Sequence, residues 1–253
     1  MHTRLPTRNP ELRTARRSCA AFTLIELLTV IAIIGILAGI IIPTVGRVRE
    51  TARAAQCISN LRQLQAAAML WIGDNRDKMP DAKAWCYNEG SSNYAWSGQL
   101  SPYLNFKAQK NLDWKNTPSP MKCDTGFLKN PPSASIHFGR TYSINTYATA
   151  TMDDGSRLKD RDPQWGYVSR LSMIEHPSRM AFFMDGAVAA GGGNYVSNVS
   201  HSHVPDSGSP PLQYVHRDSI NVVFIDGHVQ RISKADMQAN YATNETPFWR
   251  FDK

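Results

Sequence analysis

Near the N-terminus, residues 27–46 form a run of twenty amino acids without a charge, and this run constrains the fold more than any other feature. A helix of that length covers about 30 Å, which is the thickness of the hydrocarbon core of a bilayer. Residues 1–21 before it carry five arginines against one glutamate. Because a positive arm before an apolar run stays on the cytoplasmic side, we expect a membrane-spanning helix with the rest of the chain outside the cytoplasm.

The composition of the remaining chain indicates one globular domain and gives no sign of nucleic-acid binding. The chain has 253 residues, 42% of them hydrophobic, which is enough for one domain with its own core. Of the formal net charge of +7, much lies in the N-terminal arm, and 23 basic and 20 acidic side chains remain after residue 21. No basic stripe with interleaved aromatic residues is left, so we expect no nucleic-acid partner.

Three kinds of N-terminal segment contain a positive arm and an apolar run. A cleaved secretory signal has a shorter apolar core that is followed by small residues, whereas here the small residues 18–21 (SCAA) come first. A permanent signal anchor and a leader that is cut between Ala21 and Phe22 both remain open. The second would leave the whole apolar helix on the mature protein.

A carboxylate, Glu26, stands at the start of the apolar run. Deep in a bilayer an acid costs about 2.5 to 3.5 kcal/mol on insertion scales, and less near the interface. If the chain begins at Phe22, its new amino group lies four residues before Glu26, and a low dielectric leaves their attraction unscreened. The pair can form within one helix or between two staggered helices. The alternative is an acid tolerated at the interface of a plain anchor.

The segment AFTLIELLTVIAIIGILAGIIIP resembles the N-terminus of type IV pilins and type II secretion pseudopilins. Their pattern is a basic leader, a small residue that is usually Gly, then Phe, a nearby Glu and a long apolar helix. Ala21 replaces the usual Gly here. The resemblance implies that a prepilin peptidase cuts before Phe22 and methylates its amino group, and that Glu26 sets the register of subunits in a helical filament.

The apolar helix is expected to continue into an amphipathic half. Pro43 falls where the family has a helix-bending proline, and its ring crowds the carbonyl of Gly39, so we expect a bend or local melting there. Beyond Gly46, apolar residues recur at steps of three and four, whereas Arg49, Arg53, Gln56, Asn60 and Gln63 are predicted on the other side. We predict one helix from Phe22 to about Ile72, with residues 22–46 in the membrane or filament core and 47–72 packed on a head, residues 73–253.

The head is predicted to contain an antiparallel β-sheet, which makes the fold class α+β and pilin-like. Turn-forming residues fill 73–139, and strand candidates follow at 140–148, 179–185, 220–225 and 228–233. The last two flank Asp226 and Gly227, a pair that favours a two-residue type I′ hairpin.

The segment HRDSINVVFIDGHV resembles the H-X9-DG segment near the C-terminus of a large bacterial group of prepilin-type proteins. His216, Asp226 and Gly227 are its defining residues here. The stretches QCISNLRQLQAAAMLW and MKCDTG also resemble that group, although CDTG departs from its more frequent Cys-Pro-Ser. From the residues themselves, we expect Asp226 and Gly227 to form the turn and His216 to find a hydrogen-bonding place near the strand start.

Three of the four cysteines, Cys57, Cys86 and Cys123, would face an oxidising compartment. Cys57 lies on the predicted core-facing side of the helix, so a disulfide to Cys123 or to Cys86 could tie helix to head, and we favour Cys123. The alternative is that Cys57 is a small buried hydrophobe.

No residue pattern predicts an enzyme or a firm metal site. His201, His203 and His216 could ligate a metal, but the first two lie in a loop-like segment rich in Pro and Gly. Calcium in the head is the one cofactor considered, at Asp74, Asn75 and Asp77 or at residues 153–154, although no twelve-residue loop with a closing Glu is present. Motifs of hydrolases and nucleotide-binding proteins are missing from the sequence.

The sequence therefore predicts a structural subunit of a type II secretion pseudopilus or of a type IV pilus-like filament. Its expected partners are a prepilin peptidase, other pilin or pseudopilin subunits and an inner-membrane assembly platform. Its expected location is the inner membrane with the head in the periplasm, and then a filament. The alternatives are a tip or minor subunit that binds an exported substrate or surface glycan, for which WCYNEGSSNYAW offers aromatic residues, and a signal-anchored periplasmic enzyme.

Overall fold

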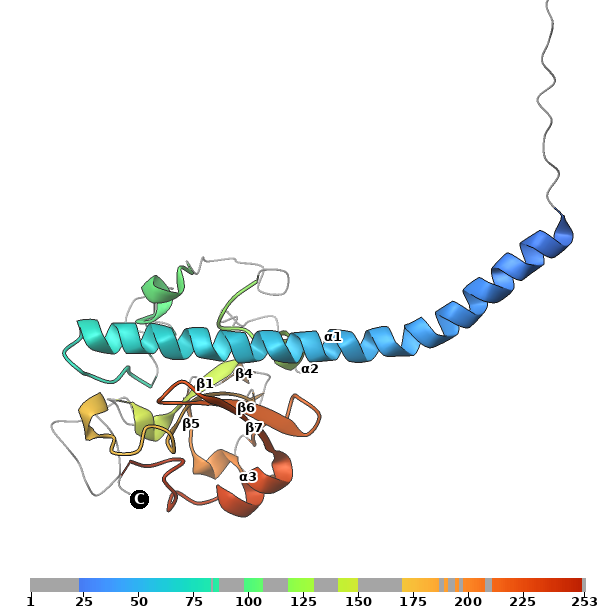
Figure 1. Cartoon of the computed structure of the whole chain (residues 1–253). Coiled ribbons are helices and arrows are strands. Elements are labelled where there is room, and N and C mark those ends of the chain that lie inside the picture. The colour runs from blue at the N-terminus through green and yellow to red at the C-terminus, as the bar shows by residue number, and fades with distance from the viewer. Residues whose placement is uncertain are drawn as a thin grey trace, which may run out of the picture. The chain divides into compact units, whose positions relative to one another are not determined.

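The computed structural model of the chain describes residues 23–82, 84–86, 98–106, 118–129, 141–149, 170–186, 189–190, 194–195, 198–207 and 211–251. The chain divides into two units, residues 1–47 and 48–253, and each is described by itself. Figure 1 shows the helices and strands of the described residues and labels most of them. They are α1 (Leu24–Asp74), α2 (Asp124–Lys129), β1 (Tyr142–Asn145), β2 (Ala181–Asp185), β3 (Ala189–Ala190), β4 (Asn194–Tyr195), β5 (Asn198–Val199), β6 (Ser219–Phe224), β7 (Val229–Ser233) and α3 (Lys234–Asn240), with short 3-10 turns at Ser101–Leu104, Thr146–Ala148, Leu171–Met173 and His201–His203.

Helix α1 is continuous over 51 residues and contains Pro43 without a break. Next to the proline, the hydroxyl of Thr44 donates a hydrogen bond to the backbone carbonyl of Ile41 at 2.8 Å. The chain therefore stays helical through Pro43, and the expected bend at Gly39 and Pro43 stays a prediction. The helix ends at Asp74, after which Arg76 and Asp77 take positive φ angles of 56° and 67°. These left-handed residues turn the chain back.

The head contains the antiparallel sheet that the sequence predicts, with one parallel edge. The strand order is β5-β1-β2-β6-β7, and the pairs β1–β2, β2–β6 and β6–β7 are antiparallel, whereas β5 joins β1 in parallel. Strands β3 and β4 form a separate small pair. The long helix and this sheet confirm the α+β, pilin-like fold class. In the view of Figure 1 the sheet lies between residues 48–74 of α1 above and α3 below.

The first strand is shorter than predicted, because Asn145 ends it. Its side-chain oxygen accepts from the backbone N–H of Tyr147 at 3.1 Å, which starts a 3-10 turn. Its amide nitrogen donates to the carbonyls of Ala181 and Trp249 at 2.9 and 3.0 Å. A buried amide with three partners is satisfied in place, so it fixes the strand end and draws the C-terminal segment onto the sheet.

From Val48 onwards α1 belongs to the same unit as the sheet and buries one side in its core. Cys57, Leu61, Leu64, Ala68 and Trp71 are all buried, as the apolar periodicity predicts. Asn60 is an exception to the predicted polar side, because it is only 4% exposed. Its amide donates to the carbonyl of Lys122 at 2.9 Å and accepts from Gln56 at 2.9 Å. A polar residue can thus lie inward where both of its ends are bonded.

The hairpin between β6 and β7 forms where the sequence predicts it, but its loop has three residues and not two. Phe224 and His228 close the loop, since the N–H of Phe224 donates to the carbonyl of His228 at 3.0 Å. Gly227 alone among the loop residues has a positive φ, 92°. A type I′ turn requires positive φ at two central residues. The predicted turn type is therefore wrong, and Gly227 provides the left-handed residue of a three-residue loop.

Replacing Gly227 with alanine is expected to lower the free energy of unfolding by about 1 to 2 kcal/mol, the cost of a left-handed conformation for a residue with a Cβ. The new methyl group would also lie 3.2 Å from the side-chain oxygen of Gln65. Urea unfolding of the full chain in detergent measures the change. Gly126→Ala is the matched control, because its Cβ would meet neighbours at 3.7 Å or more. An equal effect of the two substitutions would contradict the prediction.

Candidate functional sites

The start of α1 is a capping box built from Thr23 and Glu26. The backbone N–H and the hydroxyl of Thr23 donate to Oε2 of Glu26 at 2.9 and 2.7 Å, and the N–H of Glu26 lies 3.3 Å from the Thr23 hydroxyl, which accepts from it. This reciprocal arrangement satisfies N–H groups that a helix start leaves unpaired. Within the described residues no hydrogen bond reaches the other carboxylate oxygen of Glu26. Ala21 and Phe22, the predicted cleavage and methylation residues, lie outside the described residues.

The first half of α1 exposes an apolar surface. From Leu24 to Val48 the large hydrophobic side chains are 39% to 81% exposed. The helix is long and apolar enough to cross a membrane, and it is the single such helix among the described residues. A contiguous apolar surface of this kind marks a membrane or protein contact. In composition and exposure, this segment is suited to contact with lipid or with other apolar helices.

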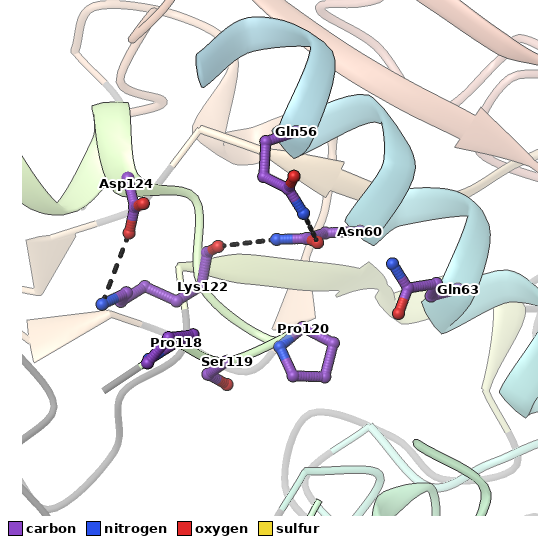
Figure 2. Close-up of a pocket in the computed structure, with 8 residues that line it drawn as sticks. All are labelled: Gln56, Asn60, Gln63, Pro118, Ser119, Pro120, Lys122 and Asp124. Carbon is purple, nitrogen blue, oxygen red and sulfur yellow. Dashed lines mark hydrogen bonds and ion pairs between the residues drawn. The ribbon is translucent and has the colours of Figure 1, made fainter. Parts of the chain in front are cut away.

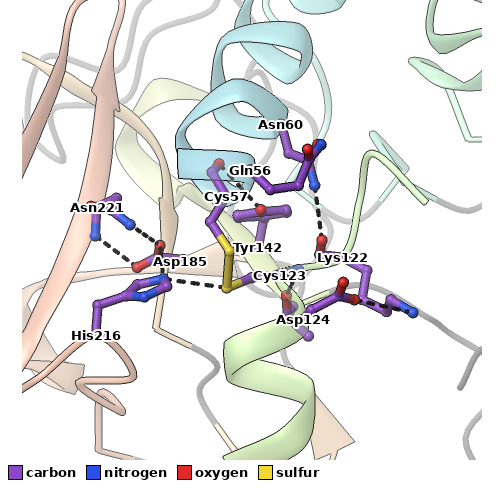
Figure 3. Close-up of a disulfide and its surroundings, with 11 residues drawn as sticks. Gln56, Cys57, Asn60, Lys122, Cys123, Asp124, Tyr142, Asp185, His216 and Asn221 are labelled. Atoms are coloured by element: carbon purple, nitrogen blue, oxygen red, sulfur yellow. Dashed lines mark hydrogen bonds and ion pairs between the residues drawn. A yellow bond between two sulfur atoms is a disulfide. The ribbon is translucent and has the colours of Figure 1, made fainter. Parts of the chain in front are cut away.

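A buried polar cluster lies where β2, the start of β6 and α1 meet, and Figure 3 shows it. Asp185 and His216 are 0% and 1% exposed, and Nε2 of His216 lies 3.0 Å from Oδ2 of Asp185. Asn221 donates to the same carboxylate twice, from its backbone N–H to Oδ1 and from its amide to Oδ2, both at 2.7 Å. Cys57 and Cys123, the pair favoured above, form a disulfide at this cluster. Sγ of Cys123 lies 3.3 Å from Nε2 of His216.

The segment from His216 to Gly227 encloses β6. At one end the backbone N–H of His216 bonds the carbonyl of Ser219 and its side chain reaches Asp185. At the other end the amide of Gln65 in α1 donates to the carbonyl of Ile225 at 2.8 Å. Six residues of strand span about 20 Å, so His216 and the Asp226–Gly227 turn are not brought together. In this chain the nine residues between His216 and Asp226 therefore contain the strand β6, and hydrogen bonds to other parts of the head hold the segment at both ends.

The His216 cluster does not have the arrangement of a catalytic triad. Asp185 and Cys123 both approach Nε2 of His216, whereas Nδ1 has no hydrogen-bond partner among the described residues. A triad needs the nucleophile and the orienting acid on opposite ring nitrogens. The cluster is also closed to solvent, so a substrate could not reach it in this conformation.

A cleft of about 440 Å³ lies beside α1, and Figure 2 shows its lining. Three carboxamides come from α1, and the rest comes from the segment before α2 and from the first residue of α2, Asp124. The lining residues are Gln56, Asn60, Gln63, Pro118, Ser119, Pro120, Lys122 and Asp124. Lys122 and Asp124 form an ion pair at 3.3 Å. The described lining residues offer hydrogen-bonding groups, but among them no nucleophile is seen next to a base, which an enzyme site needs.

The side chains considered above as metal ligands bond other protein groups in the described part of the chain. His201 bonds the hydroxyl of Tyr147 at 3.1 Å, and His203 bonds Ser200 within a 3-10 turn. Asp74 accepts from Tyr103 at 2.7 Å, and Asp77 accepts from the N–H of Ser172 at 3.1 Å. The two carboxylates therefore serve separate partners. Residues 153–154 lie outside the described residues.

The aromatic residues proposed for adhesion lie partly in the core. Trp85 is 0% exposed and packs edge-on against Phe183 with ring centroids 5.2 Å apart. Cys86 is buried beside it. Residues 87–97, which hold the rest of that stretch, lie outside the described residues. Core packing of Trp85 accounts for its side chain without a ligand.

Burial lowers the pKa of His201, and the nearby His203 lowers it further. The unfolded chain therefore binds the proton more readily, so this histidine's stabilising contribution is full above its ordinary pKa and is lost as the pH falls below about 6.5. We expect the unfolding free energy of the native protein to fall more steeply from pH 7.5 to 5 than that of His201→Gln. Urea unfolding at both pH values measures this difference. Parallel slopes would contradict the assignment.

The N-terminal segment matches a known family model. Residues 16–42 match the model described as the prokaryotic N-terminal methylation motif. Searches of curated proteins and of solved structures gave no match. The match covers the last two arginines before the predicted cut, Arg16 and Arg17, and then Phe22, Glu26 and most of the exposed apolar helix. It does not reach the His216–Gly227 segment, whose resemblance stays a prediction.

Proposed function

We propose that this chain, which carries the N-terminal methylation motif of pilins and pseudopilins, is a structural subunit of a type II secretion pseudopilus or of a type IV pilus-like filament. A prepilin peptidase cuts it before Phe22 and methylates the new amino group. The helix first anchors the subunit in the inner membrane and then packs in the filament core. An inner-membrane assembly platform and neighbouring subunits are its partners.

The observation that carries this proposal is the match of residues 16–42 to the methylation motif. It falls on a helix whose apolar side chains stay exposed from Leu24 to Val48. Such a surface is stable in a bilayer or in a bundle of like helices, and moving it from one to the other exposes no apolar area to water. The motif is a mark of structural proteins, and the described residues offer no accessible catalytic arrangement. A structural role accounts for both features.

Mass spectrometry of the intact chain tests the first step of this proposal. The full chain is expressed with an active prepilin peptidase, extracted from membranes and sequenced from its N-terminus. We expect a chain that begins at Phe22 and carries one methyl group. The matched control is the same expression with an inactive peptidase, which should leave Met1 and the arginines in place. A chain that keeps its leader beside the active enzyme would support a plain signal anchor instead.

Incorporation into a filament tests the second step. Filaments from cells that hold the whole assembly machinery are sheared, collected and probed for the chain. We expect the processed chain in the filament fraction, with the amount depending on the peptidase. A processed chain that stays wholly in the membrane would contradict the filament role, although cleavage itself would stand.

A further inference from the structure

More polar groups are buried beside the Cys57–Cys123 disulfide than a disulfide needs as hydrogen-bond partners. A disulfide has only weakly accepting sulfur atoms, yet the carboxylate of Asp185 and the imidazole of His216 lie against it, 0% and 1% exposed. Removing such groups from water costs several kcal/mol unless each finds partners. A second role for this cluster would explain why these particular groups are buried together.

The ligand atoms of the cluster converge from four segments. The sulfurs of Cys57 and Cys123 and a ring nitrogen of His216 lie within 4.8 Å of one another. Oδ2 of Asp185 lies outside this group of three, but it is 3.0 Å from Nε2 of the histidine and offers a fourth donor. Cys57 is on α1, Cys123 precedes α2, Asp185 ends β2 and His216 precedes β6. Figure 3 shows the four side chains directed at one another.

We propose that the dithiol form of this chain binds one thiophilic divalent cation, of which Zn²⁺ fits best, through Cys57, Cys123, His216 and Asp185. Two thiolates, one imidazole and one carboxylate form a closed four-ligand set of the kind that structural zinc sites use. Thiolates select against Ca²⁺ and Mg²⁺, which prefer oxygen ligands. This site is independent of the filament role proposed above, and every newly made chain is a dithiol before its disulfide forms.

Two of the observed separations are close to those around a tetrahedral ion. Zinc lies about 2.0 to 2.3 Å from nitrogen, oxygen and sulfur ligands, which places neighbouring ligand atoms about 3.3 to 3.8 Å apart. Nε2 of His216 already lies 3.3 Å from Sγ of Cys123 and 3.0 Å from Oδ2 of Asp185. The Cα atoms of the two cysteines are 5.1 Å apart. Once the sulfur–sulfur bond is broken, the two sulfurs can separate by side-chain rotation while the backbone stays in place.

A residue outside the proposed ligand set, Asn221, orients one of the ligands, Asp185. Asn221 donates two hydrogen bonds of 2.7 Å to the carboxylate of Asp185. Such outer partners orient a metal ligand, and their removal typically weakens metal affinity by about 10- to 100-fold. Asn221 therefore gives the proposal a substitution that touches no ligand atom.

The chemistry of loading is a two-electron reduction followed by proton release. A phosphine reductant takes the oxygen of one water and becomes a phosphine oxide, the sulfur–sulfur bond breaks, and the water's protons go to the two thiols. When the cation binds, both thiols lose their protons to solvent and bond the metal as thiolates. The imidazole binds through the lone pair of Nε2 and keeps its single ring proton on Nδ1. Reoxidation by a disulfide-type oxidant would reform the disulfide and release the cation.

Cobalt(II) is the probe, because its spectrum reports both its ligands and its geometry. The full chain in detergent micelles is reduced with the phosphine under nitrogen and titrated with Co²⁺. We expect one Co²⁺ per chain, with sulfur-to-cobalt charge-transfer bands and the intense visible bands of tetrahedral cobalt, all lost when Zn²⁺ displaces it. The oxidised chain should show neither set of bands. A reduced chain without charge-transfer bands, or one that is unfolded and stays so after Zn²⁺ is added, would overturn the proposal.

Four single substitutions locate the site. Cys123→Ser and His216→Gln should abolish the tetrahedral spectrum, and Asn221→Ala should weaken Co²⁺ affinity by about 10- to 100-fold. Cys86→Ser should bind as the native chain does, because Cys86 is outside the ligand set. Circular dichroism of oxidised His216→Gln and Asn221→Ala checks that both fold before reduction. Unchanged spectra in His216→Gln, or a loss in Cys86→Ser, would place the metal elsewhere and refute the assignment.

Discussion

Replacing both Cys57 and Cys123 with alanine is expected to lower the free energy of unfolding by about 4 kcal/mol. The two residues are 66 positions apart and join α1 to the segment before α2. Closing a loop of that length removes much of the conformational freedom of the unfolded chain, and the estimate follows from that loss. Since the free energy of unfolding of whole domains is only about 5 to 15 kcal/mol, the variant loses a large part of its stability.

Urea unfolding of the full chain in detergent, without reductant, measures this effect through circular dichroism and tryptophan fluorescence. Cys86→Ala is the matched control, since Cys86 is also buried but takes no part in this disulfide. Removing its sulfur should cost less than the double substitution. If the double variant unfolds at the same urea concentration as the control, the disulfide does not stabilise the fold by restricting the unfolded chain.

Patterns among neighbouring residues predict the elements that depend mainly on residues close together in the sequence. The uncharged run predicted the apolar half of α1, and the steps of three and four predicted that Cys57, Leu61 and Leu64 face the core. The Asp-Gly pair predicted the β6–β7 hairpin at its observed place. Its turn type was wrong because Asp226 does not take the positive φ that a type I′ turn requires. Loop length depends on the register of both strands, which the dipeptide alone does not determine.

The partners of His216 could not be predicted, because they are far away in the sequence. Asp185 ends a strand that reads as a plain buried segment, and nothing in its neighbours marks its carboxylate for burial. The side-chain type of Asn60 alone predicts that it lies on the polar side of α1. In the structure it lies in the core, where its amide donates a hydrogen bond to the carbonyl of Lys122. Tertiary contacts of this kind override local preference. Sheet pairing of β1 with β2 and β2 with β6 creates the buried cluster.

The start of α1 carries a further local signal in the sequence. Thr23-Leu24-Ile25-Glu26 has the spacing of a capping box before an apolar run. The hydrogen bonds between Thr23 and Glu26 show that this reading is correct. Glu26 therefore has a role within its own helix besides the pairing that was expected with the amino group of Phe22. The two roles make different demands, since capping needs an oxygen acceptor, whereas pairing with an amine needs a negative charge.

Replacing Glu26 with glutamine is expected to leave cleavage before Phe22 intact and to reduce filament incorporation by about 100-fold. Glutamine keeps the acceptor oxygen and is itself a capping-box residue, so α1 should start as before. Without the carboxylate, the positive amino group has no counter-charge among apolar helices. A charge there costs about 3 kcal/mol, which corresponds to about two powers of ten in an equilibrium. Quantifying the chain in sheared filaments, relative to its processed amount in membranes, measures the effect.

Thr23→Ala is the matched control for this experiment, because it removes the capping side chain and keeps the charge. It deletes the hydroxyl that bonds Oε2 of Glu26 at 2.7 Å, and a lost cap costs about 0.5 to 2 kcal/mol of helix stability. In a helix of 51 residues this affects one terminal turn, so incorporation should stay near the native level. If both variants fail to incorporate, assembly requires the cap at Thr23 as well as the charge of Glu26, because glutamine keeps the capping oxygen. If both incorporate normally, neither role limits assembly, and the pairing of Glu26 with the amino group of Phe22 is ruled out.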